Sequence, residues 1–504
     1  MERLHNLAEE LEALGIQSSK LGWAQYTAGY DFGIQEIQKK ILEFMGNEEH
    51  FKLICDLRKK ELRDADKRKV DIMYNLFKSY HLSHELNELR MEMNKVITEL
   101  SGILNTHRTE FEGRVVSSVE LAQIISSDEN RERRKNAYMA RNQINKPLVD
   151  AGFIKLLNLR KEYAKKAGYE DFVSMQLDDQ ELHKNLFKDW KEQLEGILPE
   201  MNIIRENYAK KYLNDTKVMP WDEAYINSKI APALNTTVDM SNYYNVIHNF
   251  FKKFGIDIST YNITYDIFPR ANKSEWGYNF PIETGKDSRV LANVKNKYNE
   301  FGVLLHETGH AVHSFLKDPN EKILNEGISG IITEGIANLF GSFLYKEIFY
   351  KEILGDDPEI KRQFDEMRKY NKVNSLRAMG RILFDQSLYT NDVNSLEDIN
   401  ALYWKNHKEL FNEEPFSDNP PWAFTIHYTT HPIYLHNYFM GDVTCEMLAQ
   451  SFNKKFNVSD PSEKPEEFAK FLIEEVINPS GMYTFGELFE KISGKQFSIE
   501  YMIK

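Results

Sequence analysis

The sequence has few cysteines and few prolines, and each scarcity excludes or favours a class of protein. It has 2 cysteines among 504 residues, too few for a disulfide scaffold, and we expect Cys55 and Cys445 each to be small buried apolar residues. Proline is sparse, at 15 residues, and long stretches are rich in Leu, Glu, Lys, Ile and Asn, which indicates a mainly helical (mainly α) protein. Long linkers, low-complexity tracts and internal repeats are absent, so residues 1–504 are predicted to form a single domain.

An excess of positive charge is missing as well. Lysine and arginine total 64 against 77 aspartate and glutamate, and the formal net charge of −13 argues against a nucleic-acid partner. The N-terminal segment, residues 1–16, is acidic and amphipathic, and it lacks the apolar core of a signal peptide. We therefore expect a soluble, cytoplasmic protein with no membrane partner, and the sequence leaves its oligomeric state open.

The segment 301–345 carries most of the chemical information. It contains the pentad HETGH at 306–310, which fits the H-E-x-x-H pattern of zinc peptidases. Residues four apart on a helix share one face, so His306 and His310 can bind one ion through their imidazoles. Glu307 lies one position round the helix and can reach a water on that ion. The alternative is a helix that carries two histidines with ordinary hydrogen-bond partners.

The second half of this segment predicts a third metal ligand. Residues 327–345 are nearly all apolar or small, and Glu334 is their one charge. The run is long enough for a membrane span, but a carboxylate at mid-bilayer would cost about 2.5–3.5 kcal/mol, which favours a buried helix. A buried carboxylate needs a partner, and a metal is one of the few that suffice. Ligands His306, His310 and Glu334 would leave a fourth position open for water, as in a catalytic site with one zinc ion.

Small residues near Glu334 support this interpretation. Gly330, Ala337 and Gly341 lie on or near its helical face, and we expect them to let a neighbouring helix or a bound ion come close. Two other carboxylates are rivals for the third ligand. We expect Glu326 to lie at the start of the helix, where an acidic residue is ordinary, and Glu347 to lie at the surface.

The rest of the chain is predicted to be helical apart from one region. Helical spacing runs through residues 2–150 and 150–230 and again from 351 to about 412. Residues 256–294 are instead rich in β-branched and aromatic residues, which predicts a small sheet of two to four strands directly before the zinc helix. An edge strand there could pair with an extended peptide, or the strands could simply brace the helix.

A late segment is rich in histidine and tyrosine. Three histidines and three tyrosines fall within the twelve residues 427–438. Amide hydrolysis on zinc makes a tetrahedral oxyanion, and a Tyr hydroxyl or His N–H near the metal would stabilise it. The alternative is an aromatic helix packed into the core.

These residues resemble the zinc-dependent gluzincin peptidases, which include the angiotensin-converting-enzyme-like dipeptidyl carboxypeptidases and the thimet-type oligopeptidases. As in the first family, Glu334 follows His310 by 24 residues and the run GKDSR at 285–289 precedes His306 by 21. The run KLGWAQYT at 20–27 is similar to that family's opening. The features shared with the oligopeptidases are His313, Pro220-Trp221-Asp222 with Tyr225, and SGKQFS at 493–498. The resemblance extends over most of the chain and does not choose between the two families.

The resemblance implies a helical ellipsoid with two halves around a deep groove, roughly residues 1–230 and a zinc-bearing half 231–504, with a small β-sheet beside the zinc helix. In both families a tyrosine and histidines from a late segment face the metal. Tyr438 matches the tyrosine that stabilises the transition state, His427 fits the upstream histidine with His431 as its rival, and Tyr434 fits a second substrate-facing tyrosine. Trp276 stands where a histidine is expected on the edge strand.

The chain also departs from the family pattern. Asn338 stands four residues after Glu334, where Asp is usual, and it brings no charge to orient a metal-binding histidine. Thr425 stands where the converting-enzyme-like family has a Lys that binds the substrate's C-terminal carboxylate, which puts release of C-terminal dipeptides in doubt. No Arg follows Arg381, so the chloride-binding Arg of that family is missing.

We therefore predict a zinc-dependent peptidase that hydrolyses short peptides by a metal-activated water. Glu307 is the general base, and Tyr438 and His427 stabilise the oxyanion. Internal cleavage and C-terminal dipeptide release both stay open. The alternatives are a non-catalytic zinc-binding helical protein that holds a peptide or partner in its groove, against which the intact Glu307 argues, and a carboxypeptidase of another zinc family with the same pentad.

Overall fold

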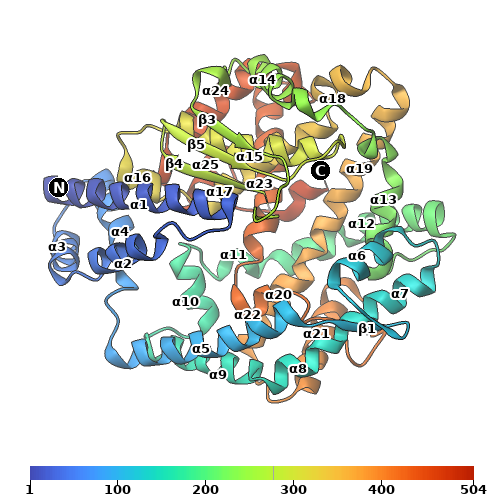
Figure 1. The fold of residues 1–504 in the computed structure, drawn as a ribbon, viewed down its shortest axis with the longest axis horizontal. Coiled ribbons are helices and arrows are strands. Elements are labelled where there is room, and N and C mark those ends of the chain that lie inside the picture. The colour runs from blue at the N-terminus through green and yellow to red at the C-terminus, as the bar shows by residue number, and fades with distance from the viewer. Residues whose placement is uncertain (276, 504) are drawn as a thin grey trace. The chain divides into compact units, whose positions relative to one another are not determined.

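The computed structural model describes residues 1–275 and 277–503, and this part of the chain is mainly helical, which confirms the predicted fold class (Figure 1). The chain divides into two compact units. The first unit comprises Met1–Leu82, Ala233–Lys361 and Met440–Phe497. The second unit comprises Ser83–Pro232, Arg362–Phe439 and the C-terminal residues from Ser498.

The first unit contains helices from three parts of the chain and one mixed sheet. Its helices are α1 (Glu2–Ala28), α2 (Ile34–Met45), α3 (Glu48–Arg58), α4 (Asp64–Lys78), α14 (Tyr243–Lys253), α15 (Glu300–Leu316), α16 (Lys322–Glu326), α17 (Gly330–Ser342), α18 (Glu347–Leu354), α24 (Pro465–Phe471) and α25 (Phe485–Ser493). Its strands are β3 (Ile263–Asp266), β4 (Tyr278–Glu283) and β5 (Asp287–Leu291).

The second unit is helical apart from one two-stranded hairpin. Its helices are α5 (His84–Thr106), α6 (Ser118–Ser127), α7 (Arg131–Ala140), α8 (Asn145–Asp150), α9 (Phe153–Lys166), α10 (Phe172–Asp179), α11 (Asn185–Lys188), α12 (Trp190–Leu213), α13 (Pro220–Ile230), α20 (Ala378–Thr390), α21 (Leu396–Phe411) and α22 (His427–Thr430). Its strands are β1 (Thr109–Phe111) and β2 (Arg114–Val116). Helices α19 (Pro358–Leu376) and α23 (His436–Phe456) have residues in both units.

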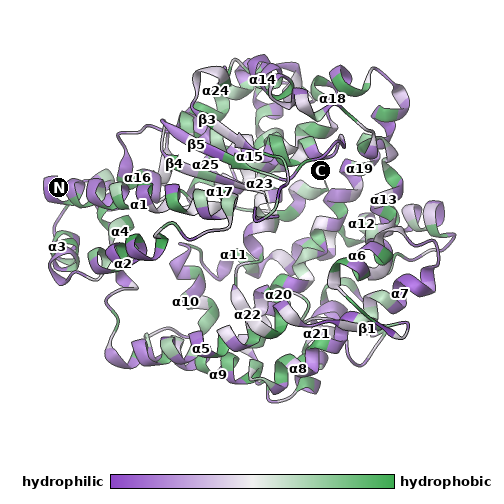
Figure 2. Ribbon diagram, viewed as in Figure 1, coloured by the Kyte–Doolittle hydropathy of each residue, from purple (hydrophilic) through white to green (hydrophobic). Residues whose placement is uncertain are grey.

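Local sequence signals explain where several helices begin and end. Ser117 and Glu120 form a reciprocal cap at the start of α6, with the Glu120 carboxylate accepting the Ser117 N–H at 2.8 Å. Asn214 and Asn412 end α12 and α21 in the left-handed conformation that asparagine tolerates. Hydrophobic and hydrophilic residues interleave along helices such as α5 and α9, as expected of helices with one buried face (Figure 2).

The predicted small sheet is present, and it packs against the helix that carries the pentad. The strand order is β3-β5-β4, with β3 parallel and β4 antiparallel to the central β5. Both β4 and β5 contact α15 (Figure 1). Thr308 of α15 is buried, and its Oγ1 lies 3.1 Å from the hydroxyl of Tyr265 on β3. The sheet therefore braces α15, and β4 remains an edge strand.

Close packing of α15 on α17 fixes the relation between the pentad and Glu334. A Cβ at Gly309 would lie 3.0 Å from the ring of Phe340 and 3.3 Å from Cα of Ala337. A Cβ at Gly341 would lie 3.5 Å from Cβ of His306. Small residues at these positions therefore let the two helices approach, as predicted for Ala337 and Gly341. The same expectation for Gly330 is wrong, because nothing lies within 4 Å of a Cβ at this first residue of α17.

None of the helices in the described ranges, 1–275 and 277–503, combines the length and the apolar character needed to cross a membrane. The predicted run 327–345 is instead divided between α17, which begins at Gly330 after a Ser329 cap, and a short 3₁₀ turn at Phe343–Tyr345.

Candidate active site

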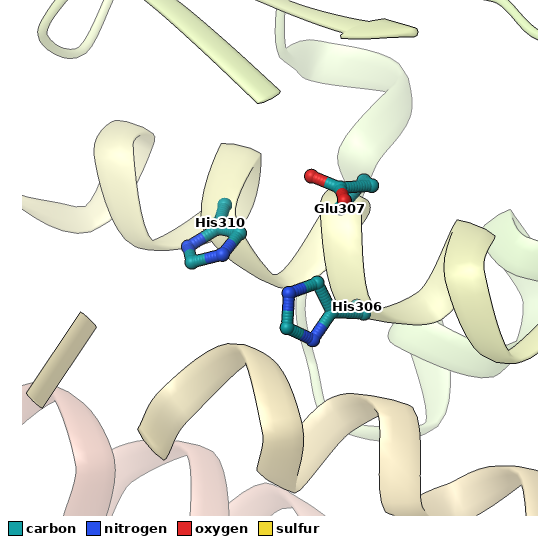
Figure 3. Close-up of side chains that lie close together, drawn as sticks. All are labelled: His306, Glu307 and His310. Carbon is teal, nitrogen blue, oxygen red and sulfur yellow. The ribbon is translucent and has the colours of Figure 1, made fainter. Parts of the chain in front are cut away.

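The pentad lies in the middle of α15 and presents its two histidines on one side. Figure 3 shows the imidazoles of His306 and His310 on the same side of the helix and the carboxylate of Glu307 displaced round it. The two imidazole rings lie 4.8 Å apart, centre to centre, at nearly a right angle. This is the arrangement that four-residue spacing on a helix predicts.

Glu334 brings one carboxylate oxygen to each imidazole. Its Oε1 lies 3.6 Å from Nε2 of His306, and its Oε2 lies 3.6 Å from Nε2 of His310. Two ligand atoms about 2.1 Å from a tetrahedral ion lie roughly 3.4 Å apart. Both separations therefore suit an ion held between these three side chains.

Glu307 offers a second possible carboxylate to such an ion. A ring nitrogen of His306, a ring nitrogen of His310 and a carboxylate oxygen of Glu307 all lie within 4.8 Å of one another. This spread is wider than the roughly 3.4 Å of a tetrahedral site, so the two 3.6 Å approaches favour Glu334 as the ligand. The carboxylate of Glu307 is then left beside the ion, where a water could lie.

Burial sets the charge state of these groups. It lowers the pKa of His306 to about 4, with the neighbouring His310 acting in the same direction, so this imidazole is neutral near pH 7 and able to bind a metal. Burial raises the pKa of Glu307 to about 7. Burial also acts to raise the pKa of Glu334, but the neighbouring imidazoles of His310 and His306 outweigh this effect, and the pKa lies below the usual value.

Glycine allows the polypeptide next to the sheet to approach Glu307 closely. A Cβ at Gly277, the residue before β4, would lie 3.3 Å from Oε1 of Glu307 and 3.0 Å from Cγ1 of Val303. Glu307 itself is 8% exposed. The enclosure made by this close approach is one source of the burial that raises the pKa of Glu307.

The rival carboxylates lie elsewhere. Glu347 is the first residue of α18 and pairs with Lys351 at 2.7 Å, so it is part of a surface ion pair. The expected place of Glu326 is wrong: it is the last residue of the short helix α16, three residues before the cap of α17. Burial raises the pKa of Glu326, and Lys317 partly opposes this rise.

The predicted side chains of the late segment come together within the second unit. The ring of Tyr438 lies 5.7 Å from the rings of both His427 and Tyr434, in edge-to-face contacts. The ring of His431 lies 5.9 Å from that of His427. Tyr434 and Tyr438 are 42% and 48% exposed, so both can meet a ligand. The orientation of any of them toward a metal stays a prediction, and Trp276 lies outside the described residues.

A strained turn holds Tyr434 in place. The preceding residue, Ile433, has a φ of +54°, a left-handed conformation that is rare for a β-branched residue. Its N–H donates to Oδ2 of Asp385 at 2.8 Å, and its carbonyl accepts from Nε2 of Gln180 at 3.1 Å. Buried Arg160 donates to the carbonyls of Tyr428 and Thr429 in α22. These polar contacts fix the segment on either side of the exposed rings.

Sequence reasoning missed one residue close to the predicted ligands. Asp442 on α23 accepts a hydrogen bond from Nδ2 of Asn338 at 3.1 Å, and the side chain of Asn338 acts to raise the pKa of His306. A neighbouring residue explains how α23 comes near: a Cβ at Gly441 would lie 2.9 Å from Cγ of Glu334. The one signal in the sequence is that an acidic residue stands four positions after Tyr438.

Comparisons with known proteins agree with the predicted fold and with the predicted family resemblance. The model of peptidase family M3 matches residues 124–260, a range that ends before the pentad. No curated protein matches the chain.

Among solved structures, PZ peptidase A is similar at 15% sequence identity with a TM-score of 0.69, over 99% of this chain and 94% of the other. Metallocarboxypeptidase 1 of Trypanosoma cruzi is similar at 15% identity with a TM-score of 0.69, over 100% of this chain and 97% of the other. An M32 carboxypeptidase of Deinococcus radiodurans is similar at 14% identity with a TM-score of 0.66, over 100% of this chain and 97% of the other. Likeness at such low identity establishes the fold.

The family match and the shared fold together confirm the predicted resemblance to the gluzincin metallopeptidases of the thimet type. They indicate a metallopeptidase, an enzyme of the hydrolase class. The cluster of His306, Glu307 and His310 on α15 could hold a metal ion.

Proposed function

We propose that this chain is a zinc peptidase that hydrolyses the peptide bonds of short peptides. Zinc would be held by His306, His310 and Glu334, a set of two imidazoles and one carboxylate that leaves one of four positions open. The main support is the 3.6 Å separation between each oxygen of Glu334 and one imidazole Nε2. A separate carboxylate, Glu307, lies beside these ligands without being needed as one.

The chemistry divides between the ion and Glu307. A bound zinc ion supplies a Lewis acid that polarises the scissile carbonyl and lowers the pKa of water. Glu307 takes a proton from the attacking water on its carboxylate and delivers it to the nitrogen of the leaving amine. A pKa of about 7 suits a group that must both accept and release a proton near neutral pH.

Tyr438 and His427 are proposed to stabilise the oxyanion by donating hydrogen bonds to it. Their rings are in contact, and Tyr438 is half exposed. Tyr434 and His431 would then contact substrate, with His431 still a rival of His427.

An extended peptide is the substrate that the sheet suits. Strand β4 is at the sheet edge and has no strand neighbour on its outer side within the described residues. Its backbone N–H and C=O groups can hydrogen-bond with a peptide in the manner of an added strand. The residue before β4, Gly277, lies against Glu307, so a peptide on this edge would run close to the proposed base.

Mass spectrometry of a mixed peptide library tests the proposal. The library is incubated with purified protein, with and without a chelator, and with the variant Glu307→Gln. Chelator-sensitive internal cuts that the variant does not make would identify an oligopeptidase, and loss of C-terminal dipeptides or single residues would identify a carboxypeptidase. An intact library, in a protein that holds zinc, would reject the peptidase proposal for these substrates and favour a binding protein.

A further inference from the structure

A cavity within the second unit is lined by arginines and aromatic side chains. Its volume is about 360 Å³, which suits a small ligand or a few atoms of a larger one. Its walls include parts of α7, α13, α20 and α21 and the segment before α22. The charged and aromatic residues that matter here are Arg141, Arg377, Arg381, Glu223, Tyr138 and Phe424.

The carboxylates near this cavity are already paired. Glu413 accepts from Arg377, with Nη1 and Oε1 2.7 Å apart, and Glu223 accepts from Arg205 at 3.1 Å. The other two arginines, Arg141 and Arg381, form no ion pair with any residue in the described part of the chain. The cavity therefore carries positive charge that the protein's own carboxylates do not neutralise.

Arg141 is the more enclosed of these two arginines. Its Nε is buried and has no hydrogen-bond partner among the described residues. Its guanidinium lies 4.3 Å from the ring centre of Phe424 and 5.9 Å from that of Tyr138. Burial lowers the pKa of Arg141, and the only opposing influence is the phenol of Tyr138 rather than a carboxylate. A buried donor on a cation without a counter-ion is a group that an anion would satisfy.

Arg381 reaches the same part of the cavity. Burial raises the pKa of Tyr138 to about 12, and the charges of Arg141 and Arg381 both act against this rise. Both guanidinium groups are therefore close to one phenol. Arg381 also lies near the late segment, because Thr425 and Tyr428 line the same cavity. Burial lowers the pKa of His427, and the charge of Arg381 acts in the same direction. The cavity thus adjoins the side chains proposed to act on substrate.

We propose that Arg141 and Arg381 bind a carboxylate of a peptide in this cavity, either its free C-terminus or the side chain of a glutamate or aspartate. Guanidinium groups bind carboxylates through paired, charge-assisted hydrogen bonds, and Arg381 is exposed, so a peptide can reach it from solvent. That the carboxylate belongs to a peptide rests on the proposed function. Thr425, which lines the cavity, contributes a hydroxyl but no charge, so the arginines supply the positive charge.

Calorimetric titration of the zinc-loaded Glu307→Gln protein with acetylated hexapeptides tests the site without consuming the peptide. Four probes are compared: a neutral sequence with a free C-terminus, its C-terminal amide, and the amide with one central Glu or one central Gln. The free terminus should bind at least tenfold more tightly than the amide if the C-terminus fills the cavity. The Glu peptide should show this preference over the Gln peptide if a side chain fills it.

Substitutions in the same protein assign the preference to the arginines. Arg381→Gln and Arg141→Gln should each remove most of the preference for the charged peptide over the neutral one. Arg381→Lys should keep part of this preference. Arg114→Gln, which removes an exposed guanidinium paired with Glu120 in the same unit, should leave it unchanged. Equal binding of charged and neutral probes, or an unchanged preference in both glutamine variants, would overturn the proposal.

The same experiment separates this site from the proposed function. If unsubstituted protein cleaves no peptide but the arginine-dependent preference is present, the peptidase proposal fails and the carboxylate site stands. If peptides are cleaved and bound without any preference for the charged probes, the carboxylate site fails and the peptidase proposal stands.

Discussion

Asn338 donates a hydrogen bond from Nδ2 to Oδ1 of Asp442, at 3.1 Å. The side chain of Asn338 also acts to raise the pKa of His306, so it lies near that imidazole. Because Nδ2 is directed to Asp442, the amide oxygen is the atom that can accept from the imidazole N–H. Asn338 stands where the related families usually have an aspartate that orients the histidine, here His306. In this structure the carboxylate is that of Asp442, which contacts Asn338 through a hydrogen bond. Asp442 therefore fixes the amide of Asn338, which we expect to orient His306 as a proposed metal ligand.

Replacing Asp442 should weaken metal binding. We expect Asp442→Ala to reduce zinc affinity by about 10–100-fold, the usual cost of losing a residue that supports a ligand, and Asp442→Asn to reduce it less because an acceptor oxygen remains. Competition with a chromogenic chelator measures the affinity without any substrate. Glu467→Gln removes an exposed acid of the same unit and is the control. An Asp442→Ala affinity equal to the control's would show that Asp442 has no such role.

Glu307→Gln should separate metal binding from turnover. The glutamine amide keeps the shape of the side chain but cannot accept the water's proton. We therefore expect kcat to fall by about 100–10,000-fold. Zinc stoichiometry, measured by atomic emission after dialysis, should stay at one ion because the three proposed ligands are intact. Cleavage at the rate of the unsubstituted protein would show that Glu307 is not the base.

Glu334→Ala should abolish stable zinc binding. Removing this carboxylate leaves two imidazoles, one fewer protein ligand than a catalytic zinc site has. Zinc content after dialysis should therefore fall well below one ion per chain. Glu347→Ala is the matched control, because Glu347 is a surface glutamate at the start of the next helix. Full zinc content in Glu334→Ala would assign the third ligand to another residue, with Glu307 the first to examine.

Much of the proposed metal site can be predicted from local sequence rules. The pentad needs only helical spacing to bring His306 and His310 together, and Glu334 is recognisable as the one charge in an apolar run. Asp442 could not be predicted in the same way, because it lies 104 residues from Asn338 and meets it only through the packing of α23.

Other features depend on contacts or conformations that the sequence does not encode locally. The hairpin β1–β2 was missed although its turn contains Glu112 and Gly113, both at positive φ, because each strand has only three residues. The positive charge of the cavity was missed because Arg141 and Arg381 are distant in sequence. A sequence alone does not show which arginines already have a carboxylate partner.

The stability of the second unit should depend on the ionisation of Asp385. Burial raises the pKa of Asp385 to about 7, whereas an unfolded aspartate titrates near 3.9. Between these values the folded state holds a proton that the unfolded state has released, so stability should fall as pH rises from about 4 to about 7. The fall is at most about 1.4 kcal/mol per pH unit. Above pH 7 the contribution should level off.

Asp385→Asn isolates this contribution. Asparagine cannot ionise, and its side-chain oxygen can still accept the N–H of Ile433. Urea unfolding from pH 4 to 8 should show a stability difference, variant minus unsubstituted protein, that grows in favour of the variant as pH rises to about 7. A difference that stays constant with pH would mean that Asp385 ionises in the folded protein at its ordinary pKa.

Gly441→Ala should damage both stability and the metal site. Alanine in a helix is ordinarily better than glycine by up to about 1 kcal/mol. Here the added Cβ would lie 2.9 Å from Cγ and 3.2 Å from Cβ of Glu334, so α23 or the ligand must move, at a cost of about 1–3 kcal/mol. Gly330→Ala is the matched control, because nothing lies within 4 Å of a Cβ there. Thermal unfolding of metal-free protein and chelator competition should show a lower Tm and weaker zinc binding for Gly441→Ala alone. If both variants behave alike, the approach of α23 at Gly441 does not constrain Glu334.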